Sequence, residues 1–186
     1  MTIVPIFVEG TEGLHSMQYP KESDCEYYRL FEIWYDYEYL LNFCKQNKDL
    51  IFNDFWAINR LEEFVEMIIE EAYKLEDMFI DFDNVGLARN SSFLQSIFIP
   101  LDYREKTVPA LQESKAKADV RKPKLRLYAI RVDKNTFILT GGCIKLTLKM
   151  DENAYTVREL EKLQIVKEFL QSHQLFNQDD LACYYE

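Results

Sequence analysis

Three stretches of the chain repeat apolar residues every three or four positions, the spacing that places them on one face of an α-helix. The pattern predicts helices over residues 26–46, 60–82 and 156–172. Asn59 is a suitable cap for the second helix, and Thr156 with Glu159 forms a capping box at the start of the third. A short helix is also expected over residues 93–98.

Strand-type patterns lie at the start of the chain and again in its last third. Residues 3–8 form a short apolar run that suits a strand or an extended arm. Residues 125–132 and 136–140 are rich in strand-forming side chains, and turn-prone residues 133–135 separate them. These two runs therefore predict a β-hairpin.

The hairpin is followed by the pair Gly141-Gly142, which predicts a bulge or a sharp bend. Residues 144–150 then alternate between apolar side chains and Lys or Thr, so one face is expected to be buried and the other cationic. Residues 114–118 have the composition of a polar linker, and residues 178–186 that of a short acidic tail.

The order of these elements favours an α+β fold made as a single domain over residues 1–186. The N-terminal helices, in a mainly helical part from about 20 to 100, are expected to pack on a small antiparallel sheet. A C-terminal helix is expected to close the sheet, within a part from about 120 to 175. The chain has 186 residues, 48% of them apolar and 15% aromatic, enough for one full core.

Several classes of protein are disfavoured by the composition. No apolar run approaches the length of a membrane span and no signal-like segment opens the chain, so we expect a cytoplasmic protein without membrane contact. The four cysteines are far apart and lack metal-ligand spacing, so we expect reduced thiols and neither a metal nor a cofactor.

Acidic residues occupy the outer face of the predicted helix over 60–82. Glu66 and Glu70 lie one turn apart and in principle suit a divalent metal. A solvated face is the favoured interpretation, because no histidine or second carboxylate helix completes a site. An enzyme that uses a carboxylate-bound metal is therefore the third choice among the functions considered.

Positive charge is concentrated in one window of an otherwise acidic chain. Residues 115–149 hold ten Lys and Arg against only Asp119 and Asp133, a formal charge of +8. The rest of the chain carries −18, for a total of −10. The window covers the predicted hairpin, where a polyanion or an acidic partner is expected to dock.

Arg126, Arg131 and Lys145 are the candidate catalytic residues, because neighbouring strands bring side chains onto one surface and Arg suits phosphate through two parallel hydrogen bonds. Further contacts to a nucleic acid are expected from Lys124 and Lys149, with a base stacked on Tyr128. The list of candidates is therefore Arg126, Arg131, Lys145, Lys124, Tyr128 and Lys149.

Two observations oppose a single cationic site. Arg126 and Arg131 have opposite parity along the strand, so without a bulge they point to opposite faces. The acidic helix over 60–82 is also able to neutralise these cations within the fold, which would make them ordinary surface residues. Neither a phosphate-binding glycine loop nor a nucleophile elbow is present, and His15 and His173 offer no convincing general base.

The segment from Lys124 to Thr147, followed by a helix rich in Glu and Lys, resembles the core of the RelE/HigB-like toxin superfamily. The resemblance covers about the last third of the chain, with Arg126, Arg131 and Lys145 at the family's basic sheet positions. It implies an α+β fold, ribosome-dependent cleavage of messenger RNA, and neutralisation by an antitoxin. The chain departs from the family in its greater length and its acidic helical half.

Two functions follow from these patterns. The first is a toxin-type protein of a toxin-antitoxin system that binds RNA or the ribosome through its basic sheet face and cleaves mRNA, with no direct DNA contact. The second is a non-catalytic module whose basic face binds an acidic protein segment, such as an antitoxin-like helix or its own tail over 178–186.

Overall fold

A computed structural model of the chain describes residues 1–85, 93–102, 110–147 and 154–186. Its elements, in chain order, are β1 Thr2–Glu9, β2 Glu12–Gln18, α1 Glu26–Tyr35, α2 Tyr37–Gln46, α3 Lys48–Ile51, α4 Leu61–Val85, α5 Phe93–Ile97, β3 Ile99–Pro100, β4 Gln112–Ala116, β5 Leu125–Asp133, β6 Thr136–Ile144, α6 Ala154–Ser172 and α7 Gln178–Tyr185. The mixed content of helices and strands confirms the α+β class.

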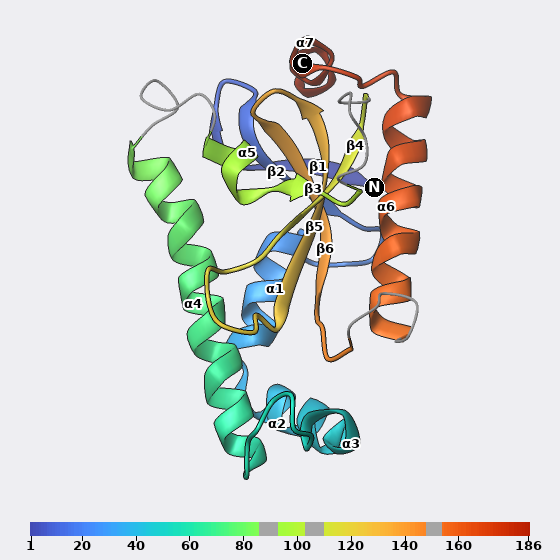
Figure 1. Cartoon of the computed structure of the whole chain (residues 1–186). Coiled ribbons are helices and arrows are strands. Elements are labelled where there is room, and N and C mark those ends of the chain that lie inside the picture. The colour runs from blue at the N-terminus through green and yellow to red at the C-terminus, as the bar shows by residue number, and fades with distance from the viewer. Residues whose placement is uncertain (86–92, 103–109, 148–153) are drawn as a thin grey trace.

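One six-stranded sheet runs through the molecule in the order β1-β2-β6-β5-β4-β3 (Figure 1). All neighbouring strands are antiparallel except β2 and β6, which pair in parallel from Gly13 opposite Thr136 to Ser16 opposite Leu139. The expected sheet was wholly antiparallel, so this pairing is a correction. Every residue of β6 is buried, as befits a central strand with both faces covered.

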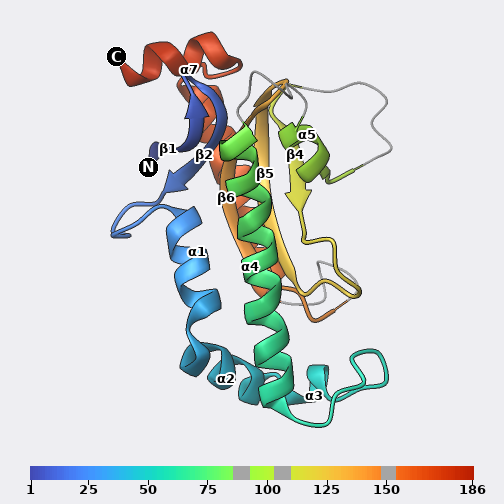
Figure 2. The ribbon, with the colours of Figure 1, turned by 90° about the vertical axis from the view of Figure 1, so that its left-hand side faces the viewer.

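Helices cover the two faces of the sheet in separate groups. Figures 1 and 2 show α4 on one side of β5 and β6 and α6 on the other. Side chains of β5 alternate between the two cores, with Leu125, Leu127 and Ala129 in the core that includes α1 and α4 residues and Tyr128, Ile130 and Val132 in the core that includes α6 residues. This alternation follows from the two-residue period of a strand.

Among the described strands, none lies beside this edge of β6 beyond Leu139, because β2 pairs with β6 only that far. Helix α1 contacts β6, and in Figure 2 it lies below β1 and β2. A Cβ atom at Gly142 would lie 3.0 Å from Leu30 Cδ1 of α1 and 2.7 Å from the Arg126 carbonyl oxygen. Glycine at this position therefore lets α1 approach the strand closely.

The predicted hairpin is confirmed as β5 and β6, and the predicted bulge is confirmed at Thr140. Tyr128 pairs with Gly141 and Ala129 with Leu139, so Thr140 is the extra residue of the bulge. The strand continues through the two glycines to Ile144 instead of bending away. The expectations for residues 148–150 lie outside the described residues.

The predicted helices are largely confirmed, but one of them is divided in two and another begins earlier than expected. The expected helix over 26–46 is two helices, because Asp36 is extended and its side chain caps α2 by accepting from the Tyr39 N–H. Helix α6 begins at Ala154, so Thr156 is inside its first turn and does not cap it. The short helix around 93–98 is confirmed as α5.

Three segments are more regular than expected. The expected linker over 114–118 lies largely in β4, which pairs with β5 and buries Ser114 and Ala116. Strand β2 had no predicted counterpart. The expected tail is the helix α7, which Asn177 caps and Leu181 anchors in the core.

The four cysteines are free, as expected. None of the helices within the described residues is long and apolar enough to cross a membrane.

Candidate functional site

A cavity of about 380 Å³ opens beside the ends of β5 and β6. Three cationic side chains, Lys122, Arg126 and Lys145, line it together with Phe55 and Trp56. Its remaining lining residues are Asn53, Pro123, Leu146 and Thr147. No carboxylate belongs to this described lining, and the cavity is called here the cationic cavity.

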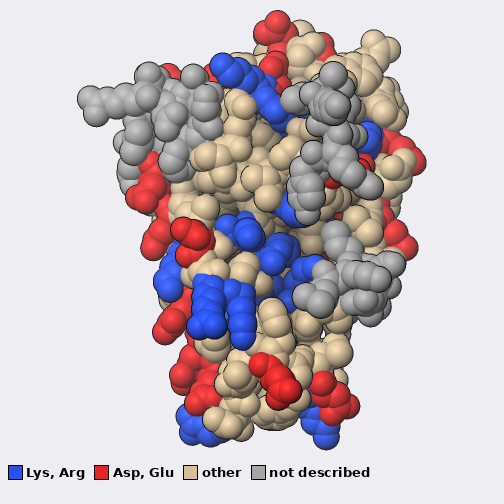
Figure 3. All heavy atoms as spheres, viewed as in Figure 1, with Lys and Arg blue, Asp and Glu red and all other residues tan. Residues whose placement is uncertain are grey.

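Figure 3 shows Lys and Arg side chains gathered on one face of the molecule, with most Asp and Glu side chains toward the margins. Burial lowers the pKa of Lys115, and the charges of Arg126 and Lys117 lower it further. Mutual repulsion of this kind favours an anion bound among the side chains.

Arg126 is held by the backbone around it. Its guanidinium donates to the carbonyl oxygens of Pro123 at 3.1 Å and Leu125 at 2.6 Å. Burial lowers its pKa, and the Glu71 carboxylate offsets this only in part. Two neutral carbonyls hold the side chain in place without neutralising its charge, so the charge remains available to a ligand.

Lys145 reaches the cationic cavity because its backbone extends the strand ladder. The Lys145 N–H donates to the Lys124 carbonyl at 2.7 Å, which keeps β6 in register just past its last residue. The Lys145 and Cys143 side chains therefore lie on the sheet face that Arg126 occupies, since Arg126 pairs with Cys143.

An aromatic surface adjoins these cations. Phe55 is 47% exposed, and the Lys122 ammonium lies 4.7 Å from its ring centroid while it donates to the Phe55 carbonyl. Trp56 is buried, and its indole N–H finds no acceptor among the described residues. The exposed Phe55 ring is therefore the aromatic surface that the cavity offers to a ligand.

Arg126 and Lys145 are the two candidate catalytic residues that the structure brings together. Arg131 lies elsewhere: its guanidinium donates to the carbonyls of Asp133 and Lys134 and packs 6.0 Å from the centroid of the Phe137 ring, on the opposite face of the sheet. The bulge at Thr140 is in β6 and does not reverse the parity of β5. The expected cluster of three is therefore not formed.

Two expected nucleic-acid contacts are buried. Tyr128 is 1% exposed and its hydroxyl faces the Cys143 sulfur, so no base can stack on it. Lys124 is 2% exposed, with its ammonium 3.8 Å from a Glu71 oxygen. Phe55, and not Tyr128, is the exposed ring beside these cations on which a base is able to stack. Lys149 lies outside the described residues.

Glu71 belongs to the acidic face of the helix over 60–82 that was expected to be solvated, and for Glu71 this expectation is wrong. Its buried carboxylate accepts from the backbone N–H groups of Lys124 and Leu125 at 2.8–2.9 Å. The acidic helix α4 therefore neutralises Lys124, as the alternative interpretation proposed. Its Glu71 carboxylate offsets the charge of Arg126 only in part. Glu66 and Glu70 belong to no group of three metal-binding side chains within the described residues.

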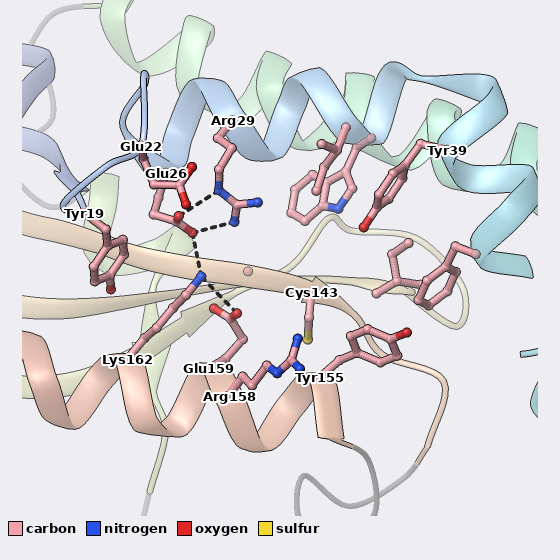
Figure 4. A pocket seen from close by; sticks show the side chains of 15 residues that line it. Tyr19, Glu22, Glu26, Arg29, Tyr39, Cys143, Tyr155, Arg158, Glu159 and Lys162 are labelled. Carbon is pink, nitrogen blue, oxygen red and sulfur yellow. Dashed lines mark hydrogen bonds and ion pairs between the residues drawn. The ribbon is translucent and has the colours of Figure 1, made fainter. Parts of the chain in front are cut away.

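A second cavity, of about 330 Å³, lies between α1, α6 and the strand β6 and is called here the inter-helix cavity (Figure 4). Its α6 wall carries Tyr155, Arg158, Glu159 and Lys162, which share one face of the helix because they are three or four residues apart. Glu26 and Arg29 of α1 face them.

Four of these side chains form a connected network. Arg29 donates twice to Glu26 at 2.8 Å, and the Lys162 ammonium lies 2.9 Å from Glu26 and 3.2 Å from Glu159. Glu159 is 5% exposed, and burial raises its pKa to about 7 against the opposing charge of Lys162. The network joins α1 to α6 across the open edge of β6.

Sequence reasoning missed the residues of this second cavity. The capping pattern places Glu159 at the start of the helix, and the apolar period alone does not separate the stripe of Tyr155, Arg158, Glu159 and Lys162 from the apolar stripe of the same helix. A polar stripe at helical spacing on a helix that also packs against a sheet was the signal available in the sequence.

Comparisons with protein-family models, curated proteins and solved structures gave no match to this chain. Membership of the RelE/HigB-like superfamily therefore stays a prediction.

Proposed function

We propose that this protein binds single-stranded RNA through the cationic cavity, with Lys122, Arg126 and Lys145 on the phosphates. The observation that carries the proposal is the convergence of three cations in one cavity whose described lining holds no carboxylate. Arg and Lys side chains supply most of the affinity for a phosphate backbone, since binding releases the counterions of the nucleic acid.

The aromatic surface favours an unpaired strand over a duplex. Phe55 is exposed beside the phosphate-binding side chains, so an unstacked base has a ring to lie on. Stacking of this kind tolerates any base, and the proposal therefore predicts weak dependence on sequence.

The test is a titration of a fluorescent single-stranded RNA of about twelve nucleotides, followed by anisotropy at several salt concentrations. Three phosphate contacts predict a slope of about −2 for the logarithm of affinity against the logarithm of salt concentration. Arg126→Ala should weaken binding about tenfold and make that slope shallower by about 0.7.

Lys134→Ala is the matched control, because Lys134 belongs to the same basic window but is exposed in the turn at the other end of the hairpin. It should leave affinity unchanged. Nitrogen-15 spectra give a second readout: RNA should shift the indole signal of Trp56 and leave that of Trp34 in place. Equal losses in Arg126→Ala and Lys134→Ala, or the absence of any binding, would overturn the proposal.

An acidic peptide of similar charge belongs in the same titration. If it binds more tightly than RNA, the protein is instead a module for an acidic partner segment. Its own C-terminal segment is not that ligand in this structure, because α7 docks elsewhere, with Tyr185 on His15 and the Gln178 N–H on Asp133.

Cleavage of mRNA on the ribosome and neutralisation by an antitoxin are further expectations from the resemblance. Arg126 and Lys145 are the residues available to polarise a phosphate, without Arg131. If labelled mRNA stays intact on translating ribosomes in the presence of the protein, the cleavage activity is absent while the binding proposal stands.

A further inference from the structure

The outer side of helices α1 and α4 carries tyrosine rings that the core leaves exposed. Tyr28 of α1 and Tyr73 of α4 are each 55% exposed, and Tyr35 of α1 is half-buried. The two helices contact each other and lie side by side in Figure 2. Single exposed aromatic residues are ordinary on a protein surface, whereas a contiguous group of them marks an interaction surface. Tyr28, Tyr35 and Tyr73 are called here the tyrosine face.

The tyrosine face is continuous across both helices. In Figure 2, α1 runs down toward α2 and α4 runs up from the level of α3, so the two helices are antiparallel. The rings of Tyr35 and Tyr73 stack at 4.6 Å between centroids. Tyr28 lies two turns before Tyr35 and Ile80 lies two turns after Tyr73, so both are displaced in the same direction. Ile80 is 41% exposed and therefore extends the apolar surface beside Tyr28.

The exposed rings are held in place by an array of rings beneath them. Tyr28 packs edge-on against the buried Tyr27 at 5.4 Å between centroids, and Tyr27 lies 4.8 Å from Phe31. Phe31 lies 6.1 Å from Tyr35, which stacks on Tyr73 at an angle of 29°. Rings fixed in this way lose little conformational freedom when a partner binds to them, so the ordering cost of binding is small.

Carboxylates surround the tyrosine face. Glu32 is exposed on α1 one turn before Tyr35, and Asp77 is exposed on α4 one turn after Tyr73. Glu76 accepts a hydrogen bond from the Tyr35 hydroxyl. Burial raises the pKa of Tyr35, and the hydrogen bond and the negative charge of Glu76 raise it further. A carboxylate therefore lies among the rings as well as on either side of them.

The sequences of α1 and α4 contain one cation each, and both cations are engaged elsewhere. Arg29 donates twice to Glu26. Lys74 lines a small cavity of about 110 Å³ together with Lys124. The cations of these two helices therefore do not belong to the tyrosine face, and its charged side chains from α1 and α4 are acidic.

Exposed tyrosine rings beside carboxylates suit an arginine-rich partner. A guanidinium stacks on an aromatic ring while its N–H groups donate to a nearby carboxylate. A nucleic acid would be repelled by these carboxylates, and a wholly apolar partner would bury them without donors. The chemistry of this surface is therefore opposite to that of the cationic cavity.

We propose that the tyrosine face docks an arginine-rich segment of a partner protein, with guanidinium groups stacked on Tyr28 and Tyr73 and hydrogen-bonded to Glu32 and Asp77. The docking surface is independent of RNA binding at the cationic cavity.

Two fluorescent peptides of about twelve residues test the proposal. One alternates arginine with alanine, and the other has lysine in place of every arginine. Anisotropy in about 150 mM salt should show the arginine peptide binding about fivefold more tightly, because the charges are equal and a guanidinium stacks better than an ammonium. Tyr73→Ala and Tyr28→Ala should each weaken the arginine peptide about fivefold while the net charge of the protein stays the same.

Phe176→Ala is the matched control, because Phe176 is 42% exposed in the connection between α6 and α7. It should leave the affinity for the arginine peptide unchanged. Nitrogen-15 spectra should show that this peptide shifts backbone signals of α1 and α4 and leaves the indole signal of Trp56 in place. Equal affinity for the two peptides, equal losses in Tyr73→Ala and Phe176→Ala, or no saturable binding up to about 1 mM would overturn the proposal.

Sedimentation of the protein alone distinguishes a partner protein from a second copy of the chain. The proposal expects a monomer. A dimer that Tyr73→Ala converts to a monomer would make the tyrosine face a self-association surface, and the proposal of an arginine-rich partner would be overturned.

Discussion

Replacement of Glu159 by Gln tests whether the buried carboxylate of α6 costs stability when it is ionised. Burial raises the pKa of Glu159 from 4.5 to about 7, so between these two values the folded chain binds a proton that the unfolded chain has released. The stabilisation from that proton is complete below about pH 4.5 and is lost as the pH rises through 7. The difference between the two pKa values corresponds to about 3 kcal/mol.

Gln is neutral at every pH, so Glu159→Gln should remove this dependence. Between pH 5 and pH 8 its free energy of unfolding should rise by about 2.5 kcal/mol relative to the parent chain. The network tolerates the change because Lys162 keeps its contact with Glu26. Urea denaturation at both pH values measures the difference, with fluorescence of the buried Trp34 and Trp56 as the signal.

Glu161→Gln is the matched control, because it makes the same chemical change at an exposed position of the same helix. A parallel shift of the Glu159→Gln chain at both pH values would refute the reasoning. It would mean that Lys162 and the surrounding dipoles already compensate the ionised carboxylate.

Three further predictions concern other parts of the fold. Glu71→Ala should cost about 3 kcal/mol or more in urea denaturation, since it leaves the Lys124 ammonium and two backbone N–H groups buried without an acceptor, whereas Glu71→Gln should retain part of that stability. Gly142→Ala should cost about 1–3 kcal/mol, measured from a melting curve, because the added Cβ meets Leu30 and the Arg126 carbonyl. Gly10→Ala provides the comparison, since its Cβ meets no atom and only the strain of a positive φ angle remains. Burial lowers the pKa of His15, so the stability that its neutral form contributes should be lost as the pH falls below 6.5. Tyr185→Phe removes the 2.7 Å hydrogen bond to His15 and should cost about 1 kcal/mol. An unchanged melting temperature of Tyr185→Phe would contradict that role.

Local patterns predicted the elements whose partners are close in sequence. The β5–β6 hairpin was predictable because its strand-type residues flank the turn at 133–135, and the side-chain period of two already separated Arg126 from Arg131. Arg126 and Lys145 meet because they lie on one face of adjacent strands, which is also a local relationship.

The rest depended on contacts between distant segments. Strand β2 has no β-branched residue and is fixed by its pairing with β1 and β6. His15 of this strand contacts Tyr185 of the distant helix α7. The inter-helix cavity exists because β2 ends early and α1 and α6 approach the uncovered edge of β6. The spacing of apolar residues within α1 or α6 does not predict that the two helices approach each other.

The parallel pairing of β2 with β6 also has a consequence during synthesis on the ribosome. Gly13 emerges more than a hundred residues before Thr136, so at the usual rate of translation the first hairpin waits for about ten seconds before its neighbour exists. During that interval Leu14 and Met17, which are later fully buried, have no sheet to cover them. The nascent first strands are therefore the segment where early aggregation or chaperone capture should concentrate.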